Sequence, residues 1–176
     1  RLIRRQRQMC IRDRQKINQK YINNLVLKAL EEDLKPNGDI TTKLINSKNK
    51  IVQAKIISKQ NGIISGIDFC KAAFKILEKK SKFSPRIKDG EKIKKNQIIA
   101  KITAKTKTIL IAERTALNFL NHASGISTIT NKYVSKVKNK TKICCTRKTT
   151  PNLRLFEKYA VKKGGGYNHR YNLSDE

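Results

Sequence analysis

Tryptophan is absent from the 176-residue chain, and proline and glycine are scarce, at three and eight residues. With 38% hydrophobic and 31% charged residues, the chain is too apolar for a disordered tail and too polar for a membrane protein. Long apolar runs are also lacking, since no stretch approaches the roughly 18 consecutive apolar residues of a transmembrane helix. The basic N-terminal stretch has no apolar segment like that of a secretory signal. These absences predict an intracellular, cytoplasmic protein.

Cysteine occurs four times, without the spacing of a disulfide framework or a zinc site. Cys144 and Cys145 are adjacent, whereas Cys10 and Cys70 stand alone. Free cysteines behave as small apolar side chains, which proteins tend to bury. We therefore expect buried or incidental free thiols.

Acidic residues are few, because 13 Asp and Glu stand against 41 Lys and Arg and leave a formal net charge of +28. Such an excess favours nucleic-acid binding, since basic proteins release counterions from phosphates. Beyond residues 1–14, however, the lysines are spread along the chain, and no zinc-finger, RNA-recognition or helix-turn-helix motif is present. A solvated basic surface is the favoured interpretation, and a basic nucleic-acid-binding module is the alternative.

Arginine is distributed differently from lysine. Residues 1–14 contain six arginines and no lysine, so we interpret them as a basic tail that is non-native or disordered. The rest of the chain has five arginines, four of them between residues 114 and 170. Arginine is the planar, bidentate donor that suits carboxylates and phosphates. A site for such a ligand and a scatter of surface arginines both remain open on these counts.

Apolar periodicity and turn residues predict a small α+β layer in the first part of the chain. One helix is expected over residues 17–34, ended by the turn-forming Pro-Asn-Gly-Asp that follows it. Another is expected over residues 68–77. The expected strands cover residues 50–58, 62–66, 82–88 and 97–103.

From residue 107 the pattern indicates the start of a parallel β/α arrangement. A first helix is expected to end at Ser124-Gly125, where another begins. A strand over residues 142–145, a loop and a helix over residues 153–163 follow. The three glycines at 164–166 are expected to serve backbone geometry rather than to bind phosphate.

Two cationic segments follow the ends of predicted strands in this second part. Arg147 and Lys148 come directly after the strand over residues 142–145, and His169 and Arg170 occupy the next such position. In parallel β/α folds the loops that leave the C-terminal ends of the strands carry the active site. The pattern therefore places these four residues at the rim of an active site.

Four blocks of sequence resemble the quinolinate phosphoribosyltransferase family. They are EEDLKPNGDITT at 31–42, AERTALNFLNHASGIST at 112–128, CTRKTTPNLRLFEKYAVKKGGGYNHR at 145–170 and LSD at 173–175. The resemblance implies an α/β fold, with an N-terminal α/β sandwich domain over residues 15–106. Residues 107–176 would then be the first part of an incomplete α/β barrel, the phosphoribosyltransferase domain. The resemblance also implies an N-terminal fragment, because the family's barrel is longer.

The resemblance implies a carboxylating pentosyltransferase of NAD biosynthesis. Such an enzyme transfers phosphoribosyl from phosphoribosyl pyrophosphate to quinolinate and gives nicotinate mononucleotide, pyrophosphate and CO₂. Quinolinate carries two adjacent carboxylates, so its pocket needs several fixed cations that orient and stabilise it. No covalent protein nucleophile is needed.

By resemblance, the two cationic segments bind quinolinate, and Arg147, Lys148 and His169 also act in catalysis. Thr146 is expected to orient its loop through its hydroxyl. Arg114 is expected to reach into the site of a partner subunit, which implies a homodimer and leaves a higher oligomer possible. The substrate-binding set is thus Arg114, Thr146, Arg147, Lys148, His169 and Arg170.

The resemblance also implies Mg²⁺ as a cofactor, bound together with phosphoribosyl pyrophosphate. After Arg114 the only acidic residues are Glu157, Asp175 and Glu176, and they are not arranged to hold the metal. We therefore expect no metal ligand within this chain and the magnesium ligands beyond residue 176. The chain alone is then expected to be inactive. No nucleic-acid or membrane partner is expected.

Several residues near the motifs invite separate interpretations. We expect His122 to be structural, and Arg154 either to help with the substrate or to pair with Glu157 three residues on. Cys145 stands where the family commonly has an acidic residue. Asn152 stands where it usually has glycine, and asparagine tolerates the left-handed conformation, so the turn is expected to survive.

Two alternatives to the quinolinate enzyme remain open. A phosphoribosyltransferase associated with molybdenum transport shares the motifs but acts on an unknown base, and only a quinolinate site gains affinity from both carboxylates. A nucleic-acid-binding module would instead show steep salt dependence and would tolerate substitution of Arg147.

Overall fold

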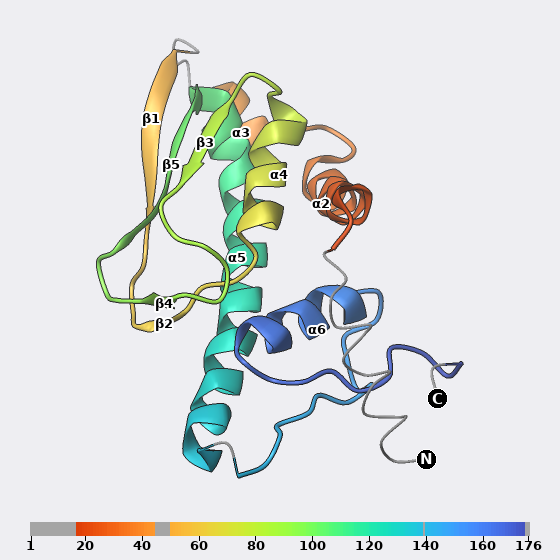
Figure 1. Ribbon diagram of the computed structural model, residues 1–176. Coiled ribbons are helices and arrows are strands. Elements are labelled where there is room, and N and C mark those ends of the chain that lie inside the picture. The colour runs from red at the N-terminus through yellow and green to blue at the C-terminus, as the bar shows by residue number, and fades with distance from the viewer. Residues whose placement is uncertain (1–16, 45–49, 139, 175–176) are drawn as a thin grey trace.

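The computed structural model describes residues 17–44, 50–138 and 140–174 (Figure 1). The predicted tail over residues 1–14 lies outside these ranges, as do Cys10 and the two final acidic residues. The elements are, in chain order, α2 (Gln19–Leu34), α3 (Ile40–Leu44), β1 (Ile51–Ile57), β2 (Gly62–Ile63), α4 (Ile67–Leu77), β3 (Lys82–Pro85), β4 (Lys92–Ile93), β5 (Ile98–Lys105), α5 (Thr106–Val137) and α6 (Arg154–Lys163).

The predicted first helix is confirmed as α2. Asn18 caps it, since its side-chain oxygen accepts from the backbone N–H of Lys20 at 2.8 Å. Its buried residues Ile22, Val26 and Leu30 recur every four positions and so form one stripe along the helix. This stripe packs into the core against α4.

The sheet is antiparallel, in the order β1-β5-β3, with β5 in the middle, while β2 and β4 form a separate two-stranded pair. Alternate residues of β5, namely Ala100, Ile102 and Ala104, are buried. Lys101, Thr103 and Lys105 alternate with them on the other face, where both lysines are exposed and Thr103 is half-buried, as the two-residue period of a strand requires. In Figure 1 the sheet lies on one side of α4 and α5, and α2 lies on the other.

A cluster of three phenylalanines joins both parts of the chain. Phe69 of α4 stacks on Phe119 of α5 with ring centroids 5.6 Å apart, and it meets Phe156 of α6 edge-on at 4.7 Å. Phe119 and Phe156 complete the triangle at 5.5 Å. Edge-to-face pairs add favourable quadrupole contacts to the burial of apolar area. The cluster therefore holds α6 against the first part of the chain.

The break predicted at Ser124-Gly125 is wrong, because α5 is one continuous helix of 32 residues. The Ser124 side chain does not cap a new helix. Its hydroxyl donates to the backbone carbonyl of Ser65 at 3.2 Å and accepts from the Ser65 N–H at 3.0 Å. A glycine within a helix costs only about 1 kcal/mol relative to alanine. Packing of the buried Ala123 and Ser127 on either side outweighs that cost.

Asp89 links three segments of the fold through its carboxylate. It accepts from the backbone N–H groups of Gly66 and Ile67, at 2.9 and 3.1 Å, where α4 begins. It also accepts from the Tyr159 hydroxyl of α6 at 2.6 Å. Burial, followed by the charge of Asp89, raises the pKa of Tyr159 above its ordinary value. Tyr159 therefore stays protonated and remains a donor.

The three glycines at 164–166 serve backbone geometry, as predicted. A Cβ on Gly164 would lie 2.4 Å from the Ser127 carbonyl oxygen, so only glycine permits this approach to α5. Gly165 has a φ of 88°. The expectation for Asn152 is also confirmed, since its φ is 64°.

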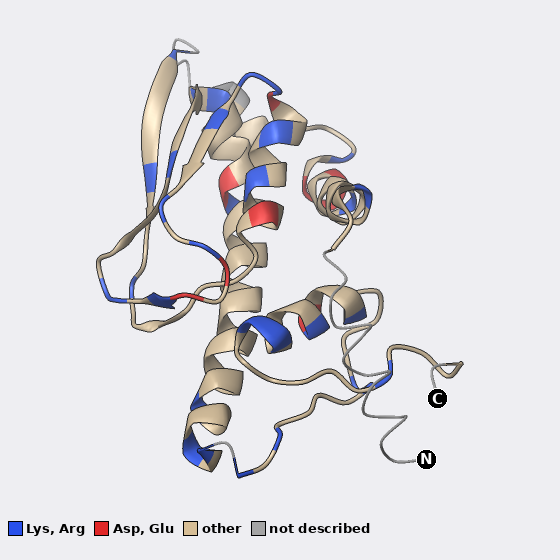
Figure 2. Cartoon of the chain, in the orientation of Figure 1, with Lys and Arg blue, Asp and Glu red and all other residues tan. Residues whose placement is uncertain are grey.

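Basic side chains are spread over the sheet and the helices alike (Figure 2). Among the described residues, ion pairs join Lys35 to Glu31 at 3.1 Å and His122 to Glu157 at 3.3 Å. No helix in the described ranges is long and apolar enough to cross a membrane.

Two alanine substitutions test this account of α5 and its contact with the glycines. Gly125→Ala should raise the free energy of unfolding by up to about 1 kcal/mol, because alanine favours a helix interior and nothing lies within 4 Å of the added Cβ. Gly164→Ala should lower it by about 1–3 kcal/mol through overpacking. Urea unfolding followed by circular dichroism measures both. A loss of stability in Gly125→Ala would show that α5 is not a regular helix at this point.

Candidate active site

The predicted strand over residues 142–145 is reduced to an isolated parallel bridge between Cys144 and Tyr167. The Cys145 N–H donates to the Tyr167 carbonyl at 3.0 Å, and the Tyr167 N–H donates to the Ile143 carbonyl at 2.8 Å. Because the two segments run in the same direction, the residues that follow each of them leave at the same edge. We call residues 146–150 the first loop and residues 168–171 the second loop.

The first loop is organised by its own hydrogen bonds. The Thr146 hydroxyl accepts from the Lys148 N–H at 3.1 Å, and the Arg147 carbonyl accepts from the Thr149 N–H at 2.9 Å. Lys148 is exposed and Arg147 is half-buried. The Nε atom of Arg147 is buried, with no hydrogen-bond partner among the described residues. Such a donor is costly unless a ligand satisfies it.

The second loop has a buried base and an exposed tip. The Asn168 side-chain amide donates to the Lys158 carbonyl at 3.2 Å and to the Tyr171 hydroxyl at 3.1 Å. His169 and Arg170 are exposed. The fold thus brings together the loops that carry Arg147, Lys148, His169 and Arg170, which sequence spacing alone separates by about twenty residues.

Arg114 lies elsewhere, on an exposed position of α5. Its neighbours Ala112 and Ala116 face the core. Within the described ranges, no hydrogen bond or ion pair joins Arg114 to either loop. The structure therefore does not place this arginine in the same site as the loops of its own chain.

Arg154 does not pair with Glu157, as one of its two expected roles required, and its role toward the substrate stays a prediction. Its Nε donates to the Thr149 hydroxyl at 3.1 Å, and its Nη1 donates to the Tyr171 carbonyl at 2.9 Å. Glu157 instead pairs with His122 at 3.3 Å and accepts from the Thr150 N–H at 3.2 Å.

Lys158 is the residue that sequence reasoning missed. Its side chain is only 1% exposed, although lysine is almost never fully buried without partners. Its Nζ donates to Cys145 Sγ at 2.9 Å and to the His169 carbonyl at 3.0 Å. A lysine among 41 basic residues gives no compositional signal. Only its spacing of four from Arg154 could have marked it.

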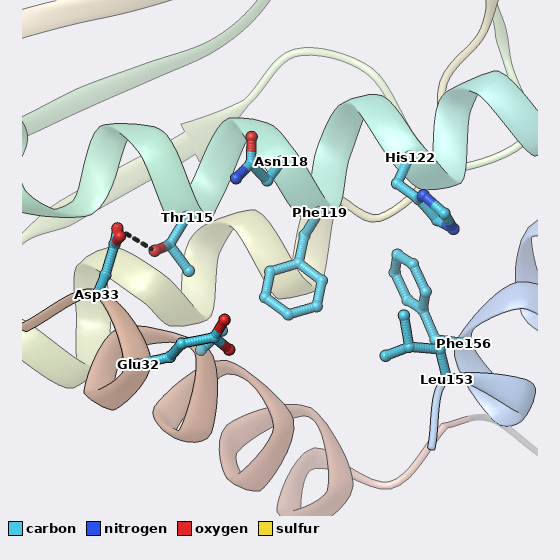
Figure 3. A pocket seen from close by; sticks show the side chains of 9 residues that line it. Glu32, Asp33, Thr115, Asn118, Phe119, His122, Leu153 and Phe156 are labelled. Atoms are coloured by element: carbon cyan, nitrogen blue, oxygen red, sulfur yellow. Dashed lines mark hydrogen bonds between the residues drawn. The ribbon is translucent and has the colours of Figure 1, made fainter. Parts of the chain in front are cut away.

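A cavity of about 270 Å³ lies between α2, α5 and α6 (Figure 3). Its polar lining includes Glu32 and Asp33, and the Asp33 carboxylate accepts from the Thr115 hydroxyl at 3.5 Å. An acidic lining does not suit an anionic ligand, so we do not assign this cavity to the ligand of the cationic loops. His122 borders it and stacks on Phe156 with ring centroids 5.8 Å apart. This contact fits the structural role expected for His122.

No group of three or more His, Cys, Asp or Glu side chains that could hold a metal ion occurs within the described part of the chain. The site that the loops form is instead a set of cations and hydroxyls. Such a set can bind and orient a ligand with several carboxylates or phosphates.

Two family models match the chain, both from quinolinate phosphoribosyl transferases. The model of the N-terminal domain matches residues 39–124, and the model of the C-terminal domain matches residues 126–176. The two matches meet within α5, where no loop separates them.

Relatives and solved structures agree with these matches. The chain is 39% identical to a probable carboxylating nicotinate-nucleotide pyrophosphorylase of Bacillus subtilis, covering 88% of this chain and 55% of that protein. The corresponding protein of Methanocaldococcus jannaschii is 42% identical, with 88% and 54% covered. The structure of a Francisella tularensis nicotinate-nucleotide pyrophosphorylase superposes with a TM-score of 0.85 at 38% identity, covering 90% of this chain and 56% of that one. The chain thus spans about half the length of the curated relatives it matches.

The thiols beside the site and in the core should differ sharply in reactivity. Burial, followed by the charge of Asp89, raises the pKa of Cys70 from 9.0 to about 12, whereas Cys144 is exposed. A shift of this size lowers the thiolate fraction roughly a thousandfold. Iodoacetamide at pH 8 should therefore alkylate Cys144 and spare Cys70 in the folded protein, as read by peptide mass spectrometry.

The same shift sets the direction of a pH effect. The unfolded chain releases the Cys70 proton near pH 9, before the folded chain does. This thiol's contribution to stability should therefore fall as the pH rises from about 9 towards 12.

In the alkylation experiment, equal modification of Cys70 and Cys144 in the folded protein would contradict the burial of Cys70.

Proposed function

Since the chain belongs to the quinolinate phosphoribosyltransferase family, we propose that the protein carrying it transfers phosphoribosyl from phosphoribosyl pyrophosphate to quinolinate. The products are nicotinate mononucleotide, pyrophosphate and CO₂, as a step of NAD biosynthesis. The relatives' names as carboxylating nicotinate-nucleotide pyrophosphorylases support this reaction. The observation that carries the proposal is the pair of cationic loops at one edge of a parallel bridge.

Quinolinate binding follows from the charges of the loops. Arg147 and Lys148 of the first loop, with His169 and Arg170 of the second, approach the ligand from two segments. Two adjacent carboxylates match this arrangement, and charge-assisted hydrogen bonds to them are the strong ones. The Nε of Arg147, which lacks a partner among the described residues, leaves one donor for this ligand to satisfy. Thr146 orients the loop by accepting the Lys148 N–H.

The reaction needs orientation and charge stabilisation from these residues. The ring nitrogen of quinolinate forms a bond to the anomeric carbon, and the bond from that carbon to the pyrophosphate oxygen breaks. The bond between ring carbon 2 and its carboxylate then breaks, CO₂ leaves, and its electron pair remains on the ring until a proton replaces it. The fixed cations hold the ring in line and stabilise the charge that develops.

The finer architecture and the assembly belong to the same proposal. An N-terminal α/β sandwich followed by the first part of an incomplete barrel is consistent with the antiparallel sheet and the parallel bridge. A homodimer in which Arg114 enters the partner's site is supported by the exposure of Arg114 on α5. We further propose a cytoplasmic location and no nucleic-acid partner.

Magnesium would accompany phosphoribosyl pyrophosphate. The described residues do not fit a site for it, because they lack a cluster of carboxylates. We therefore propose that the protein ligands of the magnesium ion lie outside these residues.

Release of CO₂ from carboxyl-labelled quinolinate, in the presence of phosphoribosyl pyrophosphate and Mg²⁺, tests the activity. We expect release by the protein that carries this chain and none when nicotinate replaces quinolinate. A folded protein that releases no CO₂ and binds both acids equally would favour the molybdenum-associated relative. Steeply salt-dependent DNA binding without CO₂ release would favour the nucleic-acid-binding module.

Substitution of Arg147 tests the site itself. Arg147→Ala should weaken quinolinate binding by about a hundredfold. This factor is near the upper end of what the loss of a charged hydrogen-bonded contact costs. The unfolding midpoint should hardly change, because the Arg147 side chain makes no hydrogen bond or ion pair within the described part of the chain. Calorimetric titration and thermal unfolding measure the two effects, and Arg86→Ala, at an exposed arginine in the first part of the chain, is the control. Unaltered affinity in Arg147→Ala would exclude this residue from the site.

A further inference from the structure

Helix α6 carries two cations that face the loops, Arg154 and Lys158. Residues four apart in a helix lie on the same face, one turn from each other. Neither cation has been given a role in the proposed reaction. Each of them, however, makes one contact to the first loop or the residue just before it and one contact to the second loop.

Arg154 joins the two loops near their far ends. Its Nε donates to the Thr149 hydroxyl in the first loop, and its Nη1 donates to the Tyr171 carbonyl in the second. The rigid, planar guanidinium fixes the angle between its donors. The two contacts therefore hold Thr149 and Tyr171 at a set separation.

Lys158 joins the loops where they leave the parallel bridge. Its Nζ donates to the Cys145 thiol, next to Thr146, and to the carbonyl of His169. The same ammonium lies 4.9 Å from the centre of the Tyr171 ring, within the range of a cation–π contact. The sulfur, the carbonyl and the ring face thus receive the charge of a side chain that is 1% exposed.

Burying the Lys158 ammonium costs free energy, so this lysine is not there merely to keep the protein soluble. Taking a charge out of water is unfavourable unless partners replace its hydration. Exposed lysines such as Lys101, Lys132 and Lys148 carry their charge in water without that cost. The arrangement is instead what is needed to fix two backbone segments to one helix, one through a side chain and one through a carbonyl.

We infer that Arg154 and Lys158 are positioning residues that together set the spacing of the two cationic loops. This inference rests on the proposed function for its effect on catalysis. Neither residue needs to touch quinolinate. They act through Arg147 and His169, whose separation must match that of two carboxylates on one ring. Misplacement by about 1 Å is enough to cost a hundredfold in rate.

Hydrogen–deuterium exchange of the protein that carries this chain tests the inference without reference to any substrate. Lys158→Met and Arg154→Met remove the charged donors and keep the apolar part of each side chain. Lys132→Met, at an exposed lysine of α5, is the matched control. In both α6 variants, Lys158→Met and Arg154→Met, peptides covering residues 143–150 and 166–172 should exchange hydrogen at least about tenfold faster. This is the effect expected when a charge-assisted hydrogen bond is lost. Peptides of α4 and β5 should not change.

Faster exchange in one segment only, or in neither, would overturn the inference, because each cation is argued to hold both loops. If Lys158→Met unfolds the protein, Arg154→Lys decides. It keeps the charge but not the two diverging donors, so both segments should still exchange faster. Unchanged exchange in Arg154→Lys would also overturn the inference.

The ratio of the nicotinate dissociation constant to the quinolinate dissociation constant gives a second readout. Partial unfolding of a variant changes both constants by the same factor, so it leaves their ratio unchanged. This ratio should fall at least about tenfold in the Arg154 and Lys158 variants, because loops out of position lose the benefit of the second carboxylate. An unchanged ratio would reduce the two residues to a purely structural role. If the unsubstituted protein itself shows no preference for quinolinate, the proposed function fails, and the exchange experiment still decides on positioning.

Discussion

The packing of Phe156 against Phe69 and Phe119 is the interaction on which the site depends. These rings, 4.7 to 5.6 Å apart, hold α6 against α4 and α5. Phe156 lies on the face of α6 that packs on α4 and α5. Arg154 and Lys158 lie on the face toward the loops. Because a helix is rigid, the depth at which Phe156 packs determines where both cations meet the loops. The hydrophobic core thus acts directly on the geometry of the cationic residues.

The site holds cations in place without neutralising them. Within the described ranges, Arg154 is held by a hydroxyl and a carbonyl, and Lys158 by a thiol, a carbonyl and an aromatic ring. None of these partners is a carboxylate. A carboxylate at such a position would compete with an anionic ligand for the same cations. The Cys145 sulfur accepts from Lys158 in its place.

The sequence predicted most local elements and the identity of the loops, but not what supports them. The helix α2 follows from the four-residue spacing of Ile22, Val26 and Leu30, and the turn at Asn152 follows from asparagine's tolerance of positive φ. The break at Ser124-Gly125 was wrong because the Ser124 hydroxyl finds its partner at Ser65, 59 residues away. No local pattern reports such a partner. The pairing of Arg154 with Glu157, within its own helix, was wrong, because the partners of Arg154 lie on two loops.

By itself, the sequence determined where several of the helices and strands form, such as α2, α4, β1 and β5, and which segments carry the cations. Those properties depend on periodicity, caps and motifs that act within a few residues. Tertiary structure alone decided that α5 runs unbroken, that Lys158 is buried, and that the two loops leave one edge and share the same helix for support. These features depend on contacts between residues far apart in the chain. Their energies come from burial and from partners that only the folded arrangement brings within reach.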